Sequence, residues 1–408
     1  MRILIATSYR GMVGGAERYL RTLIPGLLAR GHELGVLYEY TETATGEQID
    51  SKAWNVPVWC LEDIGGRAVL EQIAEWRPEV VYSQGLANLD FEQQLLEQYP
   101  VALFSHSYNG SCISGLKCHS FPRPRPCART LGLGCLGLYY PRRCGGLNPA
   151  TMLQMFRVQM RRKARLPQYQ AVLVASRHMY DEFLRNGVSA DKLYLVPLPT
   201  TDLDPDECEP MLRDPGGEIL FLGRLSAVKG VHYLIQSIPA AAERLKRPLK
   251  LTIAGEGPER QKLQQLALRW RVPAEFVGWV SKDKKIGLMR NADVLVVPSL
   301  WPEPFGLVGI EAGCVGLPAV GYAVGGVHDW LFPGESGELA PGDPPTISGF
   351  TEALVRALAD PAHYAGLRRG SWRIARCFTL ENHLDKLENV VFAGHRAAAR
   401  FPVNDWRS

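Results

Sequence analysis

Short apolar runs alternate along this chain with longer segments whose apolar residues recur at the spacing of a helix. The first run spans residues 2–7, and a glycine-rich turn separates it from a helix predicted over about residues 16–30. Each run is short and apolar throughout, which is typical of parallel strands covered by helices on both faces. The pattern predicts a doubly wound α/β domain. Further strands of this half are predicted at residues 34–38, 80–83, 101–105 and 171–176.

A second series of the same kind follows a break in the pattern. Residues 199–217 are polar, acidic and rich in proline and glycine, which disfavours both helix and strand. We interpret them as a linker between an N-terminal domain (1–198) and a C-terminal domain (218–376), with a helical segment (377–408) closing the chain. Two Rossmann-like domains joined in this way face each other across a cleft, where strand ends bind ligands. Strands of the second domain are predicted at residues 218–222, 249–254, 275–277, 293–298 and 317–322.

Charge is unevenly distributed along the chain. The 408 residues include 46 basic and 42 acidic side chains, so the formal net charge is only +4. Residues 98–180 nevertheless contain twelve Lys and Arg and no Asp or Glu. No apolar run approaches the roughly 20 residues of a membrane-spanning helix, and the apolar start is too short for a signal peptide. We therefore expect a cytoplasmic protein with one basic face.

The segment from Glu303 to Glu311 carries the strongest chemical signal. A helix beginning directly after Glu303 would place the two carboxylates about 12 Å apart, at 1.5 Å per residue. That distance suits the two ends of an extended ligand, with the backbone N–H groups of Phe305, Gly306 and Leu307 available to a phosphate. A carboxylate also accepts paired hydrogen bonds from a sugar or ribose diol. The alternative is a pair of acids on an ordinary helix.

Residues 221–230 give a second signal: a strand, a Gly-Arg pair, and a loop that carries a lysine ahead of a helix. Arg224 and Lys229 lie on the connection where a diphosphate would rest. Two cations there would neutralise a leaving group that gains negative charge. Taken alone, they would also fit two surface cations on an ordinary loop.

Together these segments resemble the retaining glycosyltransferases of family 4, which have the GT-B fold of two Rossmann-like domains. The resemblance covers nearly the whole chain, and its motifs occur in the order and spacing of that family. Each glycine motif is weak alone, but their joint occurrence is specific. The motifs are Gly14-Gly15-Ala16-Glu17, Gly223-Arg224, Lys229-Gly230, residues 254–258, 276–278 and 293–299, Glu303 with Glu311, and Gly325-Gly326.

The resemblance implies a role for each of these residues. Arg224 and Lys229 would hold the donor diphosphate. Glu303 would bind the hydroxyls of the donor sugar, and Glu311 would bind the nucleotide ribose. Further contacts to the donor are implied for Gly15, Gly278, Gly325 and Gly326.

His106, at the end of the predicted strand 101–105, matches the histidine that faces the donor sugar in the N-terminal domain of this family. Ser107 follows it where the family often has Asp, so a structural histidine in the core is the alternative interpretation.

The implied activity is transfer of a hexose from a UDP- or GDP-linked donor to an acceptor hydroxyl, with retention and without an active-site metal. The acceptor would be a carbohydrate or a lipid-linked molecule, in polysaccharide or glycolipid synthesis. One alternative is a sugar-nucleotide epimerase of similar fold, which should lack the Gly-Arg and Lys-Gly pairs. Another is a non-catalytic relative that binds nucleotide sugar, although retention of all four charged residues argues against it. Nucleic-acid binding is disfavoured, because few aromatic residues lie between the basic ones.

Five of the nine cysteines crowd into residues 112–146. In a reducing compartment such a cluster indicates metal or free thiols before disulfides, although no CxxC pair of a standard zinc ribbon is present. Cys118 is left out of the predicted ligand set because residues 117–120 look exposed; free thiols and disulfides are the alternatives. The prediction is a structural zinc held by Cys112, Cys127, Cys135 and Cys144.

A basic helix is predicted over residues 148–165, directly after the cysteines. Such a helix could dock on anionic lipid, as a peripheral membrane enzyme would. The alternative is an ordinary domain helix with a solvated basic face, because the apolar residues form no clean stripe. Its basic residues are Arg157, Arg161, Arg162, Lys163 and Arg165.

Overall fold

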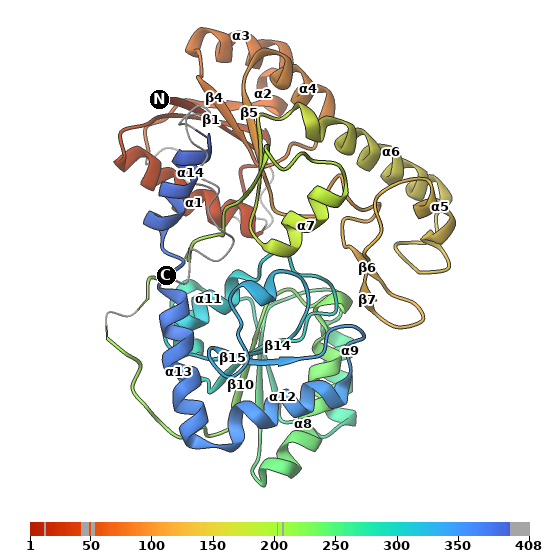
Figure 1. The fold of residues 1–408 in the computed structure, drawn as a ribbon, viewed down its shortest axis with the longest axis vertical. Coiled ribbons are helices and arrows are strands. Elements are labelled where there is room, and N and C mark those ends of the chain that lie inside the picture. The colour runs from red at the N-terminus through yellow and green to blue at the C-terminus, as the bar shows by residue number, and fades with distance from the viewer. Residues whose placement is uncertain (12–13, 42–48, 50–53, 202, 206–207, 392–408) are drawn as a thin grey trace.

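Two lobes, each built on a parallel β-sheet, make up the protein (Figure 1). The computed structural model describes residues 1–11, 14–41, 49, 54–201, 203–205 and 208–391. Within these residues the N-terminal sheet has seven strands, in the spatial order β3 (Val58–Cys60), β2 (Glu33–Tyr40), β1 (Arg2–Tyr9), β4 (Val80–Ser83), β5 (Val101–Ser105), β8 (Ala171–Val174) and β9 (Leu193–Leu195). The helices of this lobe are α1 (Gly15–Ala29), α2 (Leu61–Ile64), α3 (Gly66–Trp76), α4 (Leu89–Gln98), α5 (Gly134–Tyr139), α6 (Pro149–Arg165) and α7 (Arg177–Arg185).

Helices cover both faces of the N-terminal sheet, because alternate residues of each strand point to opposite sides. Leu4 and Val81 face the side where α3, α4 and α7 pack, whereas Ile5 and Tyr82 face the side of α1. Every residue of β4 and β8 is buried as a result. The doubly wound arrangement predicted from the apolar runs is confirmed.

The C-terminal lobe repeats this architecture. Within the described residues its sheet has six parallel strands, in the order β12 (Ala274–Gly278), β11 (Lys250–Ala254), β10 (Glu218–Leu222), β13 (Val294–Val297), β14 (Ala319–Tyr322) and β15 (Gly337–Ala340). Its helices are α8 (Val231–Leu245), α9 (Arg260–Arg269), α10 (Lys282–Asn291), α11 (Leu307–Cys314), α12 (Ile347–Ala359) and α13 (Pro361–Ala375). Its short 3-10 turns are η2 (Ala227–Lys229) and η3 (Gly325–Asp329), and another, η1 (Leu166–Gln168), lies in the N-terminal lobe.

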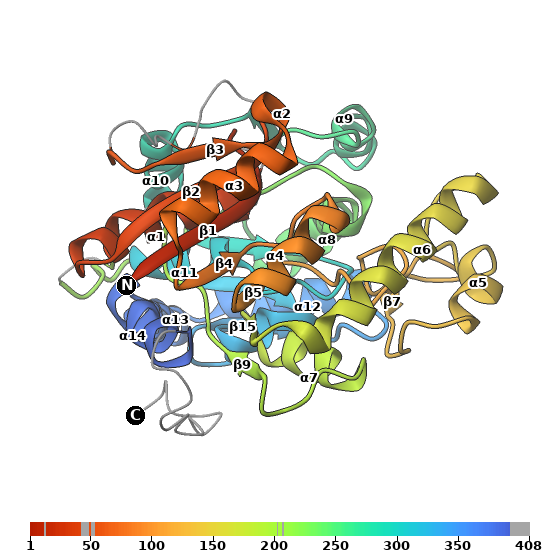
Figure 2. The same cartoon turned by 90° about the horizontal axis from the view of Figure 1, so that it is seen from above.

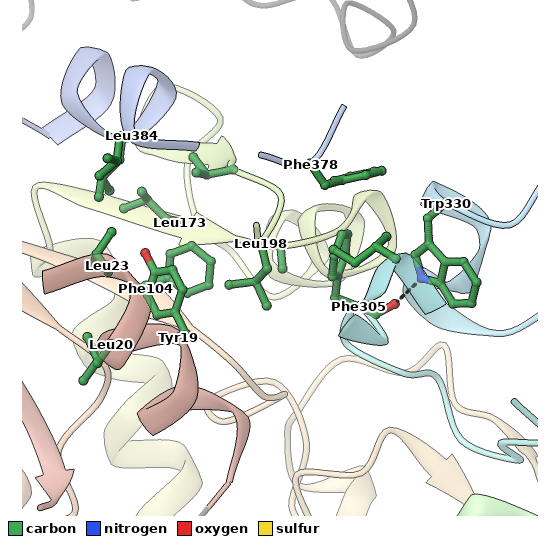
Figure 3. Close-up of a cluster of buried hydrophobic side chains, with 14 of the residues drawn as sticks. Tyr19, Leu20, Leu23, Phe104, Leu173, Leu198, Phe305, Trp330, Phe378 and Leu384 are labelled. Atoms are coloured by element: carbon green, nitrogen blue, oxygen red, sulfur yellow. Dashed lines mark hydrogen bonds between the residues drawn. The ribbon is translucent and has the colours of Figure 1, made fainter. Parts of the chain in front are cut away.

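The helix α14 (Leu380–Val391) returns from the C-terminal lobe to the N-terminal one. Its Leu384 joins a buried cluster with Leu20 and Leu23 of α1, and the cluster continues through Leu198 to Phe305 in the other lobe (Figure 3). One apolar core therefore spans both lobes, so the chain end helps to fix how they face each other.

The apolar runs locate the central strands closely. Those at residues 80–83, 101–105 and 218–222 begin and end as predicted. The pattern does not predict the edge strands β3, β9 and β15, because β3 and β9 have only three residues each and β15, with the sequence Gly-Glu-Leu-Ala, is no apolar run. Residues 208–217, in the predicted linker, contain no helix or strand.

The cysteine-rich residues 112–146, here called the insert, extend with α5 and α6 away from both sheets (Figure 2). The insert contains one short antiparallel pair, β6 (Cys118–His119) with β7 (Arg125–Pro126), and the helix α5. Its own buried apolar cluster consists of Ile113, Leu131 and Tyr139, with Met and Phe residues of α6 packed against it. So small a core provides little stability by itself.

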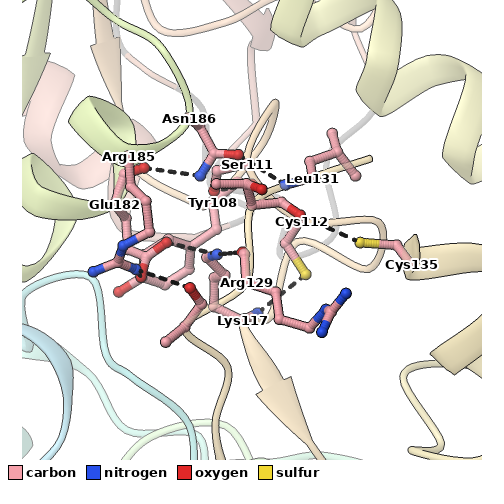
Figure 4. A network of polar contacts seen from close by, with 12 residues as sticks. Tyr108, Ser111, Cys112, Lys117, Arg129, Leu131, Cys135, Glu182, Arg185 and Asn186 are labelled. Atoms are coloured by element: carbon pink, nitrogen blue, oxygen red, sulfur yellow. Dashed lines mark hydrogen bonds and ion pairs between the residues drawn. The ribbon is translucent and has the colours of Figure 1, made fainter. Parts of the chain in front are cut away.

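A buried ion pair anchors the insert to the N-terminal lobe (Figure 4). Nζ of Lys117 lies 2.6 Å from Oε2 of Glu182 on α7, and both side chains are at most 2% exposed. The same ammonium donates to the carbonyl of Arg129 at 2.5 Å. The prediction that residues 117–120 are exposed is therefore wrong at Lys117 and also at Cys118, which is buried and donates its thiol to the carbonyl of Leu300 at 3.4 Å. Their partners come from segments far away in the sequence.

Candidate functional site

Lys229 and Glu303 form an ion pair in the C-terminal lobe, on the side that meets the N-terminal lobe. Nζ of Lys229 lies 2.6 Å from Oε1 of Glu303. The same oxygen accepts hydrogen bonds from the hydroxyl of Ser299 and from Nε1 of Trp301, the latter at 3.1 Å. The Trp301 ring also lies beneath the Lys229 ammonium, at 5.5 Å, and against Tyr108 of the N-terminal lobe. Oε2 of Glu303 accepts no hydrogen bond from the described part of the chain, so it is available to a ligand.

Two glycine positions bring the charged groups together. Gly230 adopts a φ of +67°, and a Cβ there would lie 1.8 Å from the carbonyl of Pro298, so the Lys229 loop packs directly on the end of β13. Gly325 adopts a φ of +57°, and a Cβ there would lie 2.4 Å from the carbonyl of Glu303. The N–H of the adjacent Gly326 donates to that carbonyl at 2.7 Å. Gly325 and Gly326 thus hold the backbone of Glu303.

The prediction that a helix begins near Pro304 is wrong. The helix α11 begins at Leu307, after Gly306, whose φ of +93° is left-handed. A side chain on Gly306 would crowd Trp330, whose indole N–H donates to the carbonyl of Phe305 at 2.7 Å. Phe305 itself is buried in the apolar core, and because of this packing the helix begins only at Leu307.

Glu303 therefore lies on the loop ahead of α11, not in its first turn. The backbone N–H groups of Gly306 and Leu307 donate no hydrogen bond within the described residues, as an anion site at this helix start requires.

Glu311, on α11, is buried and paired. Its Oε1 lies 3.1 Å from Nζ of Lys285 on α10 and accepts the hydroxyl of Thr201 at 3.0 Å. Lys285 is itself buried. Sequence reasoning missed both partners, because Lys285 lies in a run of exposed lysines and Thr201 lies in the linker. Together they fix the carboxylate that the resemblance assigns to the ribose.

The other predicted donor residues are spread over both lobes. Arg224 is exposed, and within the described residues its guanidinium makes no hydrogen bond or ion pair. Gly278 ends β12, with its carbonyl accepting the N–H of Gly255 at 2.8 Å. Gly15 is the first residue of α1 in the N-terminal lobe, one residue after the N-cap Gly14.

His106 belongs to an aromatic cluster where β5 ends. Its Nε2 lies 2.8 Å from Oε1 of Gln84, and its ring packs edge-on against Tyr19 and tilted against Phe104. The hydroxyl of Tyr19 is also 2.8 Å from Nε2 of His383, which α14 contributes. His106 thus packs in this aromatic cluster and also lines a cavity of the N-terminal lobe, and its contact with the donor sugar stays a prediction. His383 carries no sequence signal, since its position depends on the return of α14.

Burial keeps both histidines neutral in the folded protein. It lowers the pKa of His106 from 6.5 to about 3, with help from the nearby His383, and lowers the pKa of His383 to about 4. The unfolded chain binds these protons near pH 6.5, so the free energy of unfolding should fall as the pH drops from 6.5 toward 4.

We expect a loss of about 2 kcal/mol per histidine at pH 5 relative to pH 7. Urea unfolding of the wild type and of His383→Gln at both pH values checks this. The variant, which lacks one of the two titrations, should lose roughly half as much stability on acidification. Equal losses in the two proteins would show that His383 does not contribute.

None of the nine cysteines forms a disulfide bond in the structure. In the insert, burial and the neighbouring Cys112, Cys127 and Cys135 raise the pKa of Cys144 to about 11. Among the described His, Cys, Asp and Glu residues, no group of three is placed to hold a metal ion. The structural zinc at Cys112, Cys127, Cys135 and Cys144 stays a prediction, which metal analysis of the purified protein would test.

Sequence families match the two lobes separately. Residues 13–200 match glycosyltransferase family 4, and residues 211–371 match the glycosyl transferases of group 1. The two matches together leave only residues 201–210 of the linker and the chain ends uncovered. The chain belongs to the group 1 glycosyltransferases.

Curated relatives match over part of their length. An uncharacterized glycosyltransferase of Methanocaldococcus jannaschii is 38% identical over 159 residues, 35% of this chain and 40% of the relative. The glycogen synthase of Mycobacterium tuberculosis is 38% identical over 151 residues, 36% of this chain and 34% of the relative. A phosphatidyl-myo-inositol mannosyltransferase of the same organism is 31% identical over 170 residues, 39% of this chain and 44% of the relative. The match thus spans less than half of each of these proteins.

Solved structures match over nearly the whole chain. A sucrose-phosphate synthase from Thermosynechococcus elongatus superposes with a TM-score of 0.66 at 22% identity, covering 95% of this chain and 98% of that one. HepE from Anabaena, in complex with UDP-glucose, superposes with a TM-score of 0.67 at 17% identity, covering 96% and 99%. These likenesses confirm the GT-B fold that the sequence motifs predict.

Proposed function

We propose that this chain is a retaining glycosyltransferase that moves a hexose from a UDP- or GDP-linked donor to an acceptor hydroxyl. The observation that carries the proposal is the pairing of Lys229 with Glu303 in the C-terminal lobe. Glu303 lies eight residues before the buried Glu311. Arg224 and Lys229 supply two cations for a diphosphate, and the free oxygen of Glu303 can accept sugar hydroxyls. HepE, which shares the fold, binds UDP-glucose.

Retention is proposed from the resemblance to the retaining family 4 enzymes, with transfer directly between donor and acceptor and not through an enzyme nucleophile. Glu303 is held through one oxygen by Lys229, Ser299 and Trp301, which suits hydrogen bonding better than attack on carbon. The acceptor hydroxyl would enter on the face from which the diphosphate leaves. The bond from the anomeric carbon to the phosphate oxygen breaks, and its electron pair stays on that oxygen. The acceptor oxygen forms a bond to the same carbon, and its proton transfers to the phosphate. Arg224 and Lys229 stabilise the charge that develops.

Titration with UDP and GDP tests the donor part of the proposal. We expect one of the two nucleotides to bind, and Glu311→Gln to weaken it, because an amide replaces the carboxylate that would accept the ribose hydroxyls. Calorimetry with the full chain measures this. A chain that binds neither nucleotide would contradict the proposal, whereas binding without turnover would favour the non-catalytic relative.

The insert and α6 give the chain a surface suited to an anionic membrane, and we propose that the enzyme works there on a carbohydrate or lipid-linked acceptor. Leu133 and Leu147 are 78% and 84% exposed, and Leu153 and Met160 of α6 also face outward. Among the described residues, no helix is long and apolar enough to cross a bilayer. The proposal is supported by these exposed apolar side chains, which lie near cations and would suit contact with a lipid surface.

The basic residues of α6 divide into two groups. Arg162 and Lys163 donate to the carbonyls of Leu86 and Leu131, both at 2.8 Å, and Arg165 is buried. Only Arg157 and Arg161 point outward, and Arg161 pairs with Asp90. Arg157 is therefore the cation of α6 most available to lipid.

Vesicle sedimentation tests this surface. We expect the wild type to bind vesicles rich in phosphatidylglycerol and not vesicles of phosphatidylcholine, with binding weakened by salt. Leu147→Ser/Arg157→Gln should weaken binding at least fivefold, since it removes one exposed apolar group and one cation. The matched control is Leu268→Ser/Arg269→Gln on α9, where Leu268 is 79% exposed. Equal effects of the two double variants, or no dependence on anionic lipid, would contradict the proposal.

A further inference from the structure

A cavity of about 90 Å³ lies in the N-terminal lobe beside His106, at the carboxyl ends of β4 and β5. Gln84 and His106 line it from the sheet, and Arg162 lines it from α6. No residue of the C-terminal lobe is among the described lining residues, so the cavity is distinct from the Lys229–Glu303 pair. The cavity therefore belongs to the lobe that would bind the acceptor.

The charge around this cavity is positive. Arg162 is its cation, and no carboxylate is among the described lining residues. Glu92 is a buried carboxyl that interacts electrostatically with both Arg162 and Arg165. Two guanidinium groups act on this one carboxyl, so a positive charge stays uncompensated. His106 does not compete, because burial keeps its ring neutral.

The polar groups at the cavity are mainly unused donors. Arg162 donates through Nη2 to the carbonyl of Leu86, and within the described residues its other N–H groups make no hydrogen bond. Oε1 of Gln84 is taken by His106, and Nε2 of Gln84 is buried without a partner. A buried donor without a partner is unfavourable, and an acceptor atom of a bound ligand would satisfy it.

We propose that this cavity binds an anionic phosphate group carried by the acceptor, with Arg162 as the cation and the Gln84 amide as a second donor. A guanidinium with free N–H groups and a buried amide donor match the oxygens of a phosphate. As a statement about the acceptor, the inference rests on the proposed glycosyltransferase function. The phosphate could belong to a soluble sugar phosphate or to a lipid headgroup, which share this chemistry.

Titration of the full chain with glycerol 3-phosphate tests the inference, with UDP present at saturation to occupy the donor site. We expect the wild type to bind glycerol 3-phosphate but not glycerol, and Arg162→Gln to bind at least tenfold more weakly. Arg67→Gln, which changes an exposed arginine of the same lobe on α3 away from the cavity, should bind as the wild type does. Gln84→Leu keeps the charge and removes the second donor, so it should also weaken binding and serves if Arg162→Gln fails to fold.

Vesicles containing phosphatidic acid separate the two sources of phosphate. If glycerol 3-phosphate does not bind but these vesicles bind wild type ten times more tightly than Arg162→Gln, the phosphate is that of a lipid. If neither probe distinguishes wild type from the folded variants, Arg162 only balances Glu92 and the inference is overturned. Donor hydrolysis is measured in parallel: a chain that hydrolyses a donor but binds neither probe keeps the proposed function and loses this inference.

Discussion

Lys229→Ala should lower turnover at least a hundredfold while the fold stays intact. The Lys229 ammonium lies 2.6 Å from Glu303, where it would meet both the donor sugar site and the departing diphosphate. Removing a cation that stabilises developing charge costs roughly a hundredfold, or about 2.7 kcal/mol in the barrier. Glu303 keeps its hydrogen bonds from Ser299 and Trp301, so the variant does not leave this carboxylate without partners.

The measurement is the rate of nucleoside diphosphate release from the donor, with circular dichroism as the check on folding. Lys250→Ala is a matched control, because Lys250 is an exposed cation of the same lobe and pairs with Glu218. Near-normal turnover of Lys229→Ala would remove the assignment of this residue to the leaving group.

Glu303→Gln should also lower turnover about a hundredfold, for a different reason. Three donors converge on Oε1, so the amide must turn its oxygen toward Lys229, Ser299 and Trp301. Its NH₂ group then replaces the carboxylate oxygen that is free to accept sugar hydroxyls, and an NH₂ group cannot accept. The negative charge beside the sugar is lost as well.

Donor hydrolysis by Glu303→Gln and by Glu335→Gln measures this loss. Glu335 is a carboxylate of the same lobe on the turn before β15, so it controls for the removal of a charge. An unchanged rate in Glu303→Gln, or an equal loss in both variants, would show that Glu303 does not contact the sugar.

Much of the fold can be predicted from the sequence, because buried parallel strands appear as short apolar runs. Part of the site can be predicted as well, because Glu303 and Glu311 lie within one nine-residue segment. The start of α11 cannot, since it depends on Trp330, which lies outside the segment and donates to the carbonyl of the buried Phe305. Lys285 is also missed: its sequence neighbours are exposed lysines, and only the fold turns it toward Glu311.

In the insert and α6, the positions of several side chains also depend on residues that are distant in the sequence. Lys117 resembles a surface residue in sequence, yet Glu182 of α7 holds it in the interior. The sequence of α6 likewise predicts one charged face. In the structure, however, Arg162 and Lys163 donate hydrogen bonds to the carbonyls of Leu86 and Leu131 and do not point into solvent. Partners that are distant in the sequence determine where these side chains lie, so a local sequence pattern cannot predict it.

A donor screen with the full chain tests the central claim most directly. Purified protein is incubated with a panel of UDP- and GDP-linked hexoses, and the released UDP or GDP is measured for the wild type and for Lys229→Ala. The account predicts that at least one donor is hydrolysed by the wild type, and that Lys229→Ala lowers this rate at least a hundredfold. Release from no donor in the panel, or release at equal rates by both proteins, would contradict it.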